Sequence, residues 1–112
     1  MGMGTEKHEI VFSQEVELFL DELLILLFEK EYFAFPDSAK QYVDNLISYV
    51  EQNISIHVGK EASAYYSRYG QNLKYITYRA NKMTSWYIFY QERNGVFLIR
   101  YITNNHVAAH LL

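Results

Sequence analysis

A histidine, a tyrosine and two arginines in the C-terminal half of this 112-residue chain carry the side chains most suited to chemistry. The imidazole of His106 can accept or donate a proton near neutral pH. The phenol of Tyr87 is a proton donor or a stacking surface, and Arg79 and Arg100 stay charged and can bind an anion. We therefore take His106, Tyr87, Arg100 and Arg79 as the candidate catalytic residues.

The element that would carry most of these groups is a β-hairpin centred on Asn94-Gly95. A type I′ turn needs a positive φ at both central residues, and Asn and Gly tolerate this conformation at least cost. Aromatic and β-branched residues fill the flanking runs 85–91 and 96–103, as in paired strands. The two-residue loop predicts that Arg93 lies opposite Val96.

The register of this hairpin decides which side chains share a face. An unbroken register sets Phe89 opposite Arg100 and Tyr87 opposite Ile102. The less apolar face should point outward, and it carries Tyr87, Phe89, Gln91, Leu98 and Arg100. The bulkier face should meet the helices, and it carries Trp86, Ile88, Tyr90, Phe97, Ile99 and Tyr101.

Upstream of the hairpin, the sequence predicts one short strand and two helices. Residues 8–12 alternate as a strand, and Ser13 is a plausible helix N-cap because its hydroxyl can accept a bond from a free amide. The first helix should span 14–32. A second helix should follow a break at 33–36, since Pro36 disfavours helix at the residue before it and suits the start of the next one.

The remaining segments complete the expected fold. Residues 57–72 show no clear period and should be irregular, whereas 73–79 alternate as a strand. The order predicts an α+β domain: a short N-terminal strand, an antiparallel helical hairpin and a three-stranded antiparallel sheet. We expect a single domain over 8–112, preceded at 1–7 by a disordered tail or a remnant of expression.

Charge is distributed unevenly along the chain. Ten Lys and Arg residues against thirteen Asp and Glu give a net charge of -3, which argues against a binding surface for polyanions over the whole molecule. From Ala62 onward, however, Glu92 is the only acidic residue. A local basic face therefore remains, and Lys74, Arg68 and Tyr66 are the candidate substrate-binding residues.

Composition also limits the other classes of site. The chain has no cysteine, and its histidines share no ligand spacing with carboxylates, so we expect no metal site and no cofactor. The apolar run at 18–28 contains acidic residues and is shorter than the roughly 20 residues that span a bilayer. We expect no membrane association and a cytoplasmic location.

Two motifs of the hairpin carry a resemblance to a known family. Trp-Tyr-Ile-Phe-Tyr at 86–90, the Asn-Gly turn, and Leu-Ile-Arg-Tyr-Ile at 98–102 before a polar end resemble the RelE/ParE superfamily of bacterial toxins. The resemblance covers 8–112. Tyr87 and the pair Asn105-His106 stand where many members have arginines.

The resemblance implies a function and its residues. Such toxins belong to type II toxin-antitoxin systems and are held inactive by a cognate antitoxin that wraps the helices and sheet. Their targets are mRNA on the ribosome or DNA gyrase. For an endoribonuclease, the resemblance implies that His106 gives or takes a proton and that Tyr87 is chiefly a proton donor or a stacking surface. Arg100 and Arg79 would bind the phosphate.

Other interpretations stay open. The same scaffold could serve as a non-nuclease binding protein, either a gyrase poison or a non-toxic antitoxin-binding or regulatory subunit. Arg100 could be an ordinary solvated or ion-paired side chain, and His106 could cap a turn. Tyr65, Tyr66 and Tyr69 could pack their loop onto the sheet instead of stacking on bases. The apolar excess of the first helix predicts a partner surface, or a homodimer through the helical hairpin.

Overall fold

The computed structural model describes residues 8–29 and 36–108 of the chain. The tail expected at 1–7 and the end of the first helix expected at Tyr32 lie outside the described residues. Within them the protein has the α+β class that the order of elements predicts.

The centre of the fold is a five-stranded mixed sheet with strand order β1-β5-β4-β3-β2. The strands are β1 (Glu9–Phe12), β2 (Lys60–Glu61), β3 (Lys74–Arg79), β4 (Ser85–Arg93) and β5 (Val96–Asn104). The expectation of three antiparallel strands is correct for β3, β4 and β5 but incomplete. The first strand joins the same sheet parallel to β5, and the two-residue β2 extends the opposite edge.

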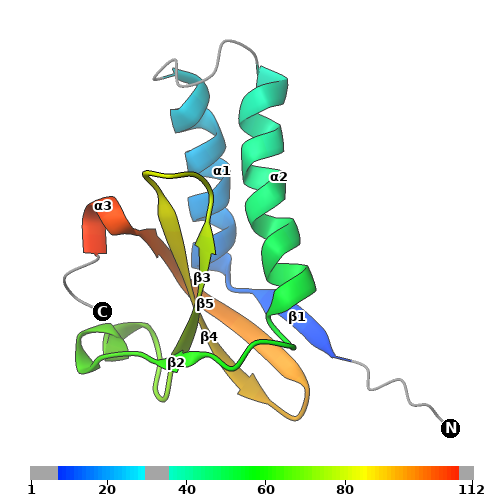
Figure 1. Cartoon of the computed structure of the whole chain (residues 1–112). Helices are drawn as coiled ribbons and strands as arrows, with labels where there is room; N and C mark the ends of the chain where they lie inside the picture. The colour runs from blue at the N-terminus through cyan, green and yellow to red at the C-terminus, as the bar shows by residue number, and fades with distance from the viewer. Residues whose placement is uncertain (1–7, 30–35, 109–112) are drawn as a thin grey trace, which may run out of the picture.

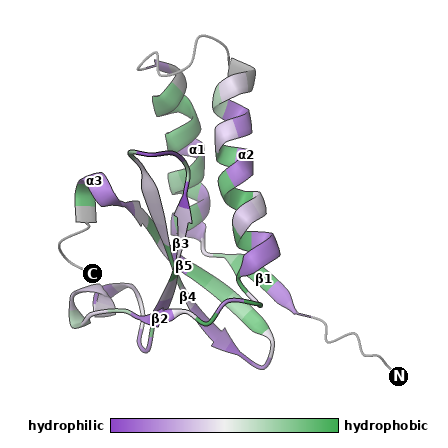
Figure 2. Ribbon diagram, viewed as in Figure 1, coloured by the Kyte–Doolittle hydropathy of each residue, from purple (hydrophilic) through white to green (hydrophobic). Residues whose placement is uncertain are grey.

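Two helices, α1 (Gln14–Glu29) and α2 (Pro36–Asn53), lie side by side in opposite directions against one face of the sheet (Figure 1). The hydroxyl of Ser13 accepts the N–H of Val16 at 3.2 Å, so the predicted N-cap is confirmed. Most of α1 is apolar, whereas α2 alternates between apolar and polar turns (Figure 2).

The main core fills the space between these helices and the sheet. Leu46 of α2 and Ile88 and Ile99 of the central strands are completely buried in it. The indole N–H of Trp86 donates to the hydroxyl of Tyr42 at 2.9 Å, so the polar atom of this buried ring is satisfied. Burial of these side chains ties the helical hairpin to β4 and β5.

A β-bulge in β5 changes the predicted faces of the hairpin. Arg93 pairs with Val96 as expected, but the register shifts between Phe89 and Tyr90, which pair with Tyr101 and Ile99. Arg100 is therefore an extra residue on β5. The predictions that Phe89 faces Arg100 and that Tyr87 faces Ile102 are wrong.

The bulge also moves one aromatic ring to the opposite face. One extra residue reverses the alternation of side chains that follow it in the strand. Tyr101, which was expected beneath the helices, lies on the outer face, and Ile102 takes its place in the main core.

A second, smaller core covers the outer face. Residues 57–72, expected to be irregular, contain β2 and a six-residue 3-10 helix, η1 (Ala64–Tyr69). This helix lays aromatic rings on the sheet. We call the result the tyrosine layer, and its members are Tyr66, Leu73 and Phe89, which are buried, and Ala62, Tyr69, Tyr75, Tyr87 and Tyr101, which are partly buried.

Candidate functional site

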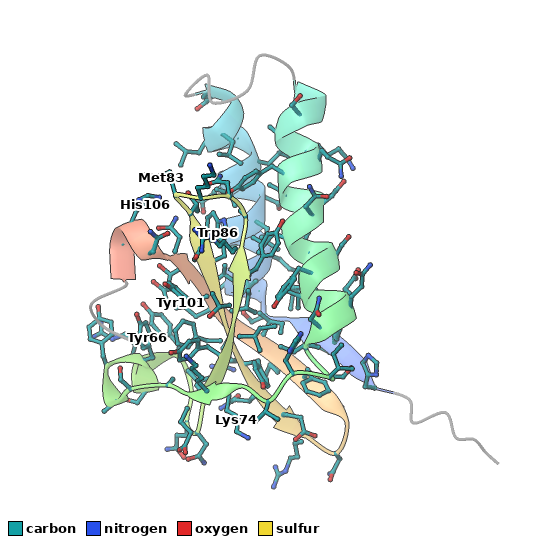
Figure 3. All side chains as sticks on the ribbon, viewed as in Figure 1. Tyr66, Lys74, Met83, Trp86, Tyr101 and His106 are labelled. Carbon is teal, nitrogen blue, oxygen red and sulfur yellow. The ribbon has the colours of Figure 1, made fainter. Side chains whose placement is uncertain are left out.

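His106 lies at one end of the sheet, on the short helix α3 (Asn105–Ala108) that follows β5. Its backbone N–H donates to the side-chain oxygen of Asn104 at 2.9 Å, and its exposed imidazole places Nε2 3.1 Å from the Thr84 hydroxyl. In Figure 3, His106 and Met83 lie together at this end, away from Tyr66 and Lys74. The candidate proton carrier thus faces the turn between β3 and β4.

The neighbouring Asn105 holds that turn in place. Its side-chain oxygen accepts the N–H of Ser85 at 2.8 Å, and its amide nitrogen donates to the carbonyl of Met83 at 3.2 Å. These bonds join the end of β5 to the residues just before β4. The position of His106 relative to the turn is therefore fixed by its neighbour as well as by its own contacts.

Arg79 reaches the same turn from the end of β3. Its Nε donates to the carbonyl of Asn81 and its Nη2 to the carbonyl of Lys82, both at 3.3 Å. These contacts are long and the side chain is exposed, so an anion could compete for the guanidinium. Arg79 and His106 are the two candidate catalytic residues that the structure brings to one turn.

The imidazole and the tyrosine layer lie on different sides of the sheet. The N–H of Ala80 donates to the carbonyl of Thr84 at 2.9 Å, and Ala80 packs against the main core beneath the helices. Strand alternation therefore puts Thr84, and the ring that contacts it, toward the helix side. Tyr87 belongs to the outer face, where its ring meets Tyr75 edge to face with centroids 6.0 Å apart.

Arg100 is held apart from this end. Its Nε donates to the carbonyl of Tyr69 at 2.7 Å, which fastens the end of η1 to β5. Along β5, about 3.3 Å per residue puts Arg100 roughly 13 Å from Asn104, where α3 begins. The four candidate catalytic residues thus form two groupings. His106 and Arg79 contact the β3–β4 turn, whereas Tyr87 and Arg100 lie at the tyrosine layer.

The candidate substrate-binding residues differ in access. Tyr66 is 1% exposed and its ring lies 4.3 Å from that of Phe89, so it packs η1 onto the sheet and has no free face for a base. Arg68 is exposed, with Cζ 4.5 Å from the centre of the Tyr65 ring. Lys74 is exposed at the beginning of β3, at the opposite end of the strand from Arg79.

One phenol in the tyrosine layer has a strongly altered acidity. The rings of Tyr69 and Tyr101 stack with centroids 3.8 Å apart and planes 7° from parallel. Burial and a hydrogen bond with Tyr101 raise the pKa of Tyr69 to about 12. Burial also raises the pKa of Tyr66. These phenols stay protonated at neutral pH, so they can donate hydrogen bonds but cannot act as bases.

Sequence reasoning missed two residues that shape this region. Thr84 was part of an expected turn, and nothing in its spacing from His106 indicates that the two side chains meet. Gly70 has φ +152°, and a Cβ there would lie 2.8 Å from Nε2 of Gln91. Its position at the end of the irregular segment was the signal available for this close approach.

The arrangement brings a proton carrier and a cation to the same turn, where His106 meets Thr84 and Arg79 bonds two carbonyls. Among residues 8–29 and 36–108, no group of three or more His, Asp or Glu side chains could hold a metal ion. No helix in that part of the chain is long and apolar enough to cross a membrane. The end of the sheet at the β3–β4 turn could bind a phosphate through Arg79 and transfer a proton through His106.

Comparison with known proteins identifies no relative: no family model, curated protein or solved structure matches this chain.

Proposed function

We propose that this protein is the toxin of a bacterial type II toxin-antitoxin system, built on the RelE/ParE scaffold. The motifs at 86–90 and 98–102 support the proposal, as does a helical hairpin that covers one face of the sheet only. The observation that carries it is that His106 and Arg79 both contact the exposed β3–β4 turn, His106 through Thr84 and Arg79 through two carbonyls.

The activity that this turn supports best is cleavage of mRNA on the ribosome by attack of the 2′-hydroxyl. That reaction needs a group that takes a proton from the hydroxyl, a donor to the leaving oxygen, and a cation beside the phosphate. The imidazole of His106 is a group that can give or take a proton, and Arg79 can release its turn carbonyls to hold the phosphate. Tyr87 lies on the outer face against Tyr75, so it is not placed beside His106 for the second proton transfer.

Inducible expression in bacterial cells tests the activity. The wild-type chain should arrest growth and leave cut transcripts, and His106→Ala should abolish both without unfolding the protein. His57→Ala is the matched control, because His57 is also exposed and also bonds a side-chain oxygen, that of Asn53 at 3.0 Å. The control variant should remain toxic.

A second candidate function is the poisoning of DNA gyrase by surface contact. It is favoured by the position of Arg100, which bonds the carbonyl of Tyr69 at the tyrosine layer and lies away from His106. A surface contact does not need these two side chains to act together. Growth arrest that persists in His106→Ala, with intact transcripts and inhibited supercoiling by purified gyrase, would support this function. Absence of arrest with the wild-type chain would overturn both.

The cognate antitoxin would bind along α1. Leu18, Ile25 and Leu26 are 55%, 56% and 46% exposed there. Ile25 and Leu26 line an apolar hollow that Glu22 and Glu29 border. This chemistry suits an antitoxin segment whose apolar side chains are flanked by Lys or Arg. A homodimer through the helical hairpin would bring these acidic residues of two copies close together, so we favour the antitoxin.

A further inference from the structure

The outer edge of β5 is only half covered. The parallel strand β1 pairs with β5 as far as Phe12 opposite Ile99, and the last bond runs from the N–H of Ser13 to the carbonyl of Ile99 at 3.0 Å. The chain then turns into α1, so no described strand continues along the edge from Arg100 to Asn104. Such an edge presents backbone donors and acceptors that can pair with another chain.

The bulge determines which backbone groups face this edge. The carbonyls of Gly95 and Ile99 accept bonds from the β1 side, as expected for alternate residues of one strand. The extra residue at Arg100 shifts that alternation by one position. The N–H and C=O of Ile102 and the N–H of Asn104 are therefore directed to the free edge, whereas the carbonyl of Asn104 accepts the first bond of α3.

A groove runs along this part of β5, between α1 and η1. It has a volume of about 350 Å³. Val16 and Phe19 of α1 line it together with Ile102, and they make the wall on the helix side apolar. An extended chain in the groove would direct every second side chain against this wall.

The opposite wall is cationic and aromatic. It is formed by Arg68, Arg100 and Tyr101. Neither arginine makes an ion pair within the described part of the chain, since Arg68 contacts the Tyr65 ring and Arg100 bonds a carbonyl. Glu15 is the one acidic residue of the groove. The remaining side chains of an extended occupant would therefore meet an excess of positive charge.

We propose that the edge of β5 from Arg100 to Asn104 binds an extended segment of another protein as an added β-strand. The segment is about five residues long, with apolar side chains toward α1 alternating with acidic side chains toward Arg68. Backbone bonds to Ile102 and Asn104 supply the pairing, and the two walls supply the selectivity. The proposal does not rest on the proposed activity, because the side chains of the two walls do not bond His106 or the β3–β4 turn; only Asn104, at the end of the edge, bonds the His106 N–H.

A synthetic peptide tests the site on the purified full-length chain. The probe is a capped heptapeptide that alternates Val or Ile with Glu, and binding is measured by fluorescence anisotropy and by amide hydrogen exchange. We expect saturable binding, with protection of the Ile102 and Asn104 amides. The same peptide N-methylated on alternate residues keeps its side chains but cannot pair, so it should bind at least about tenfold more weakly.

Two charge-reversal variants test whether binding depends on the groove itself or only on the overall charge of the protein. Arg68→Glu should weaken the peptide at least about fivefold, because it reverses the charge of the outer wall. Arg93→Glu makes the same change at the end of the β4–β5 hairpin, outside the groove, and should leave the affinity within about twofold. Absence of binding, equal binding of the N-methylated peptide, equal loss in both variants, or protection of β2 in place of β5 would overturn the proposal.

Discussion

The two faces of the sheet are packed by different means. On one face, two long helices bury aliphatic side chains against β4 and β5. On the other face, a six-residue 3-10 helix lays tyrosines on Phe89 and is fastened by the Arg100 bond to Tyr69 and the Gln91 bond to the Gln71 carbonyl. The first face should therefore set global stability, whereas the second can open locally and is the better place for binding.

The largest expected effect comes from a cavity in the main core. Ile88 is completely buried between the sheet and the helices, so Ile88→Ala should lower the free energy of unfolding by about 2 to 5 kcal/mol. Urea denaturation followed by circular dichroism measures the loss. Ile56→Ala is the control, because Ile56 is 72% exposed and its truncation should change stability by less than about 0.5 kcal/mol. Similar losses in both variants would remove the distinction between core and surface.

A smaller and more local effect should follow from Arg100→Ala. The variant removes a charge-assisted bond of 2.7 Å to the Tyr69 carbonyl, worth about 1.5 kcal/mol. Amide exchange should accelerate in η1 while the amides of α2 keep most of their protection. Arg93→Ala, at the far end of the hairpin, should leave amide exchange unchanged in both η1 and α2. Uniform loss of protection would mean that the tyrosine layer and the main core unfold as one unit.

The same contrast separates what the sequence could predict from what it could not. Ser13, Pro36 and Asn94-Gly95 act through local backbone chemistry, and the N-cap, the beginning of α2 and the hairpin turn appear where these residues stand. The bulge at Arg100 has no such local signal, because it is a property of the pairing between β4 and β5 and not of one residue type. Tyr101 was assigned to the wrong face for that reason.

The candidate site also has features that the sequence could predict and features that it could not. The sequence predicts His106 just past the last strand, and this is correct. The position follows from where the hairpin turn lies and from the length of β5. Pairwise contacts such as His106 with Thr84, or Arg79 with its own turn, depend on rotamers and loop paths. The spacing of residues along the sequence does not predict these contacts.

Alkaline pH should weaken the tyrosine layer in a defined window. The Tyr69 phenol keeps its proton in the folded chain up to a pKa of about 12, whereas an unfolded tyrosine loses it near 10. Its contribution to stability is therefore complete below pH about 10 and is lost as the pH rises toward 12. Denaturation at a series of pH values, with near-ultraviolet absorbance to follow the phenolate, measures the fall. Tyr69→Phe should make the fall shallower, and an unchanged slope would refute the assignment.

The smallest predicted effect has the opposite sign. The Tyr66 hydroxyl is buried and has no hydrogen-bond partner among the described residues, although the ring itself is packed on Phe89. A buried hydroxyl without a partner costs free energy, so Tyr66→Phe should keep the packing and raise stability by up to about 1 kcal/mol. Tyr90→Phe is the matched comparison and should lower stability, because the Tyr90 hydroxyl bonds the backbone of Gly59. A loss of stability in Tyr66→Phe would mean that its hydroxyl is satisfied, for example by a bound water, and that the outer face is as completely bonded as the main core.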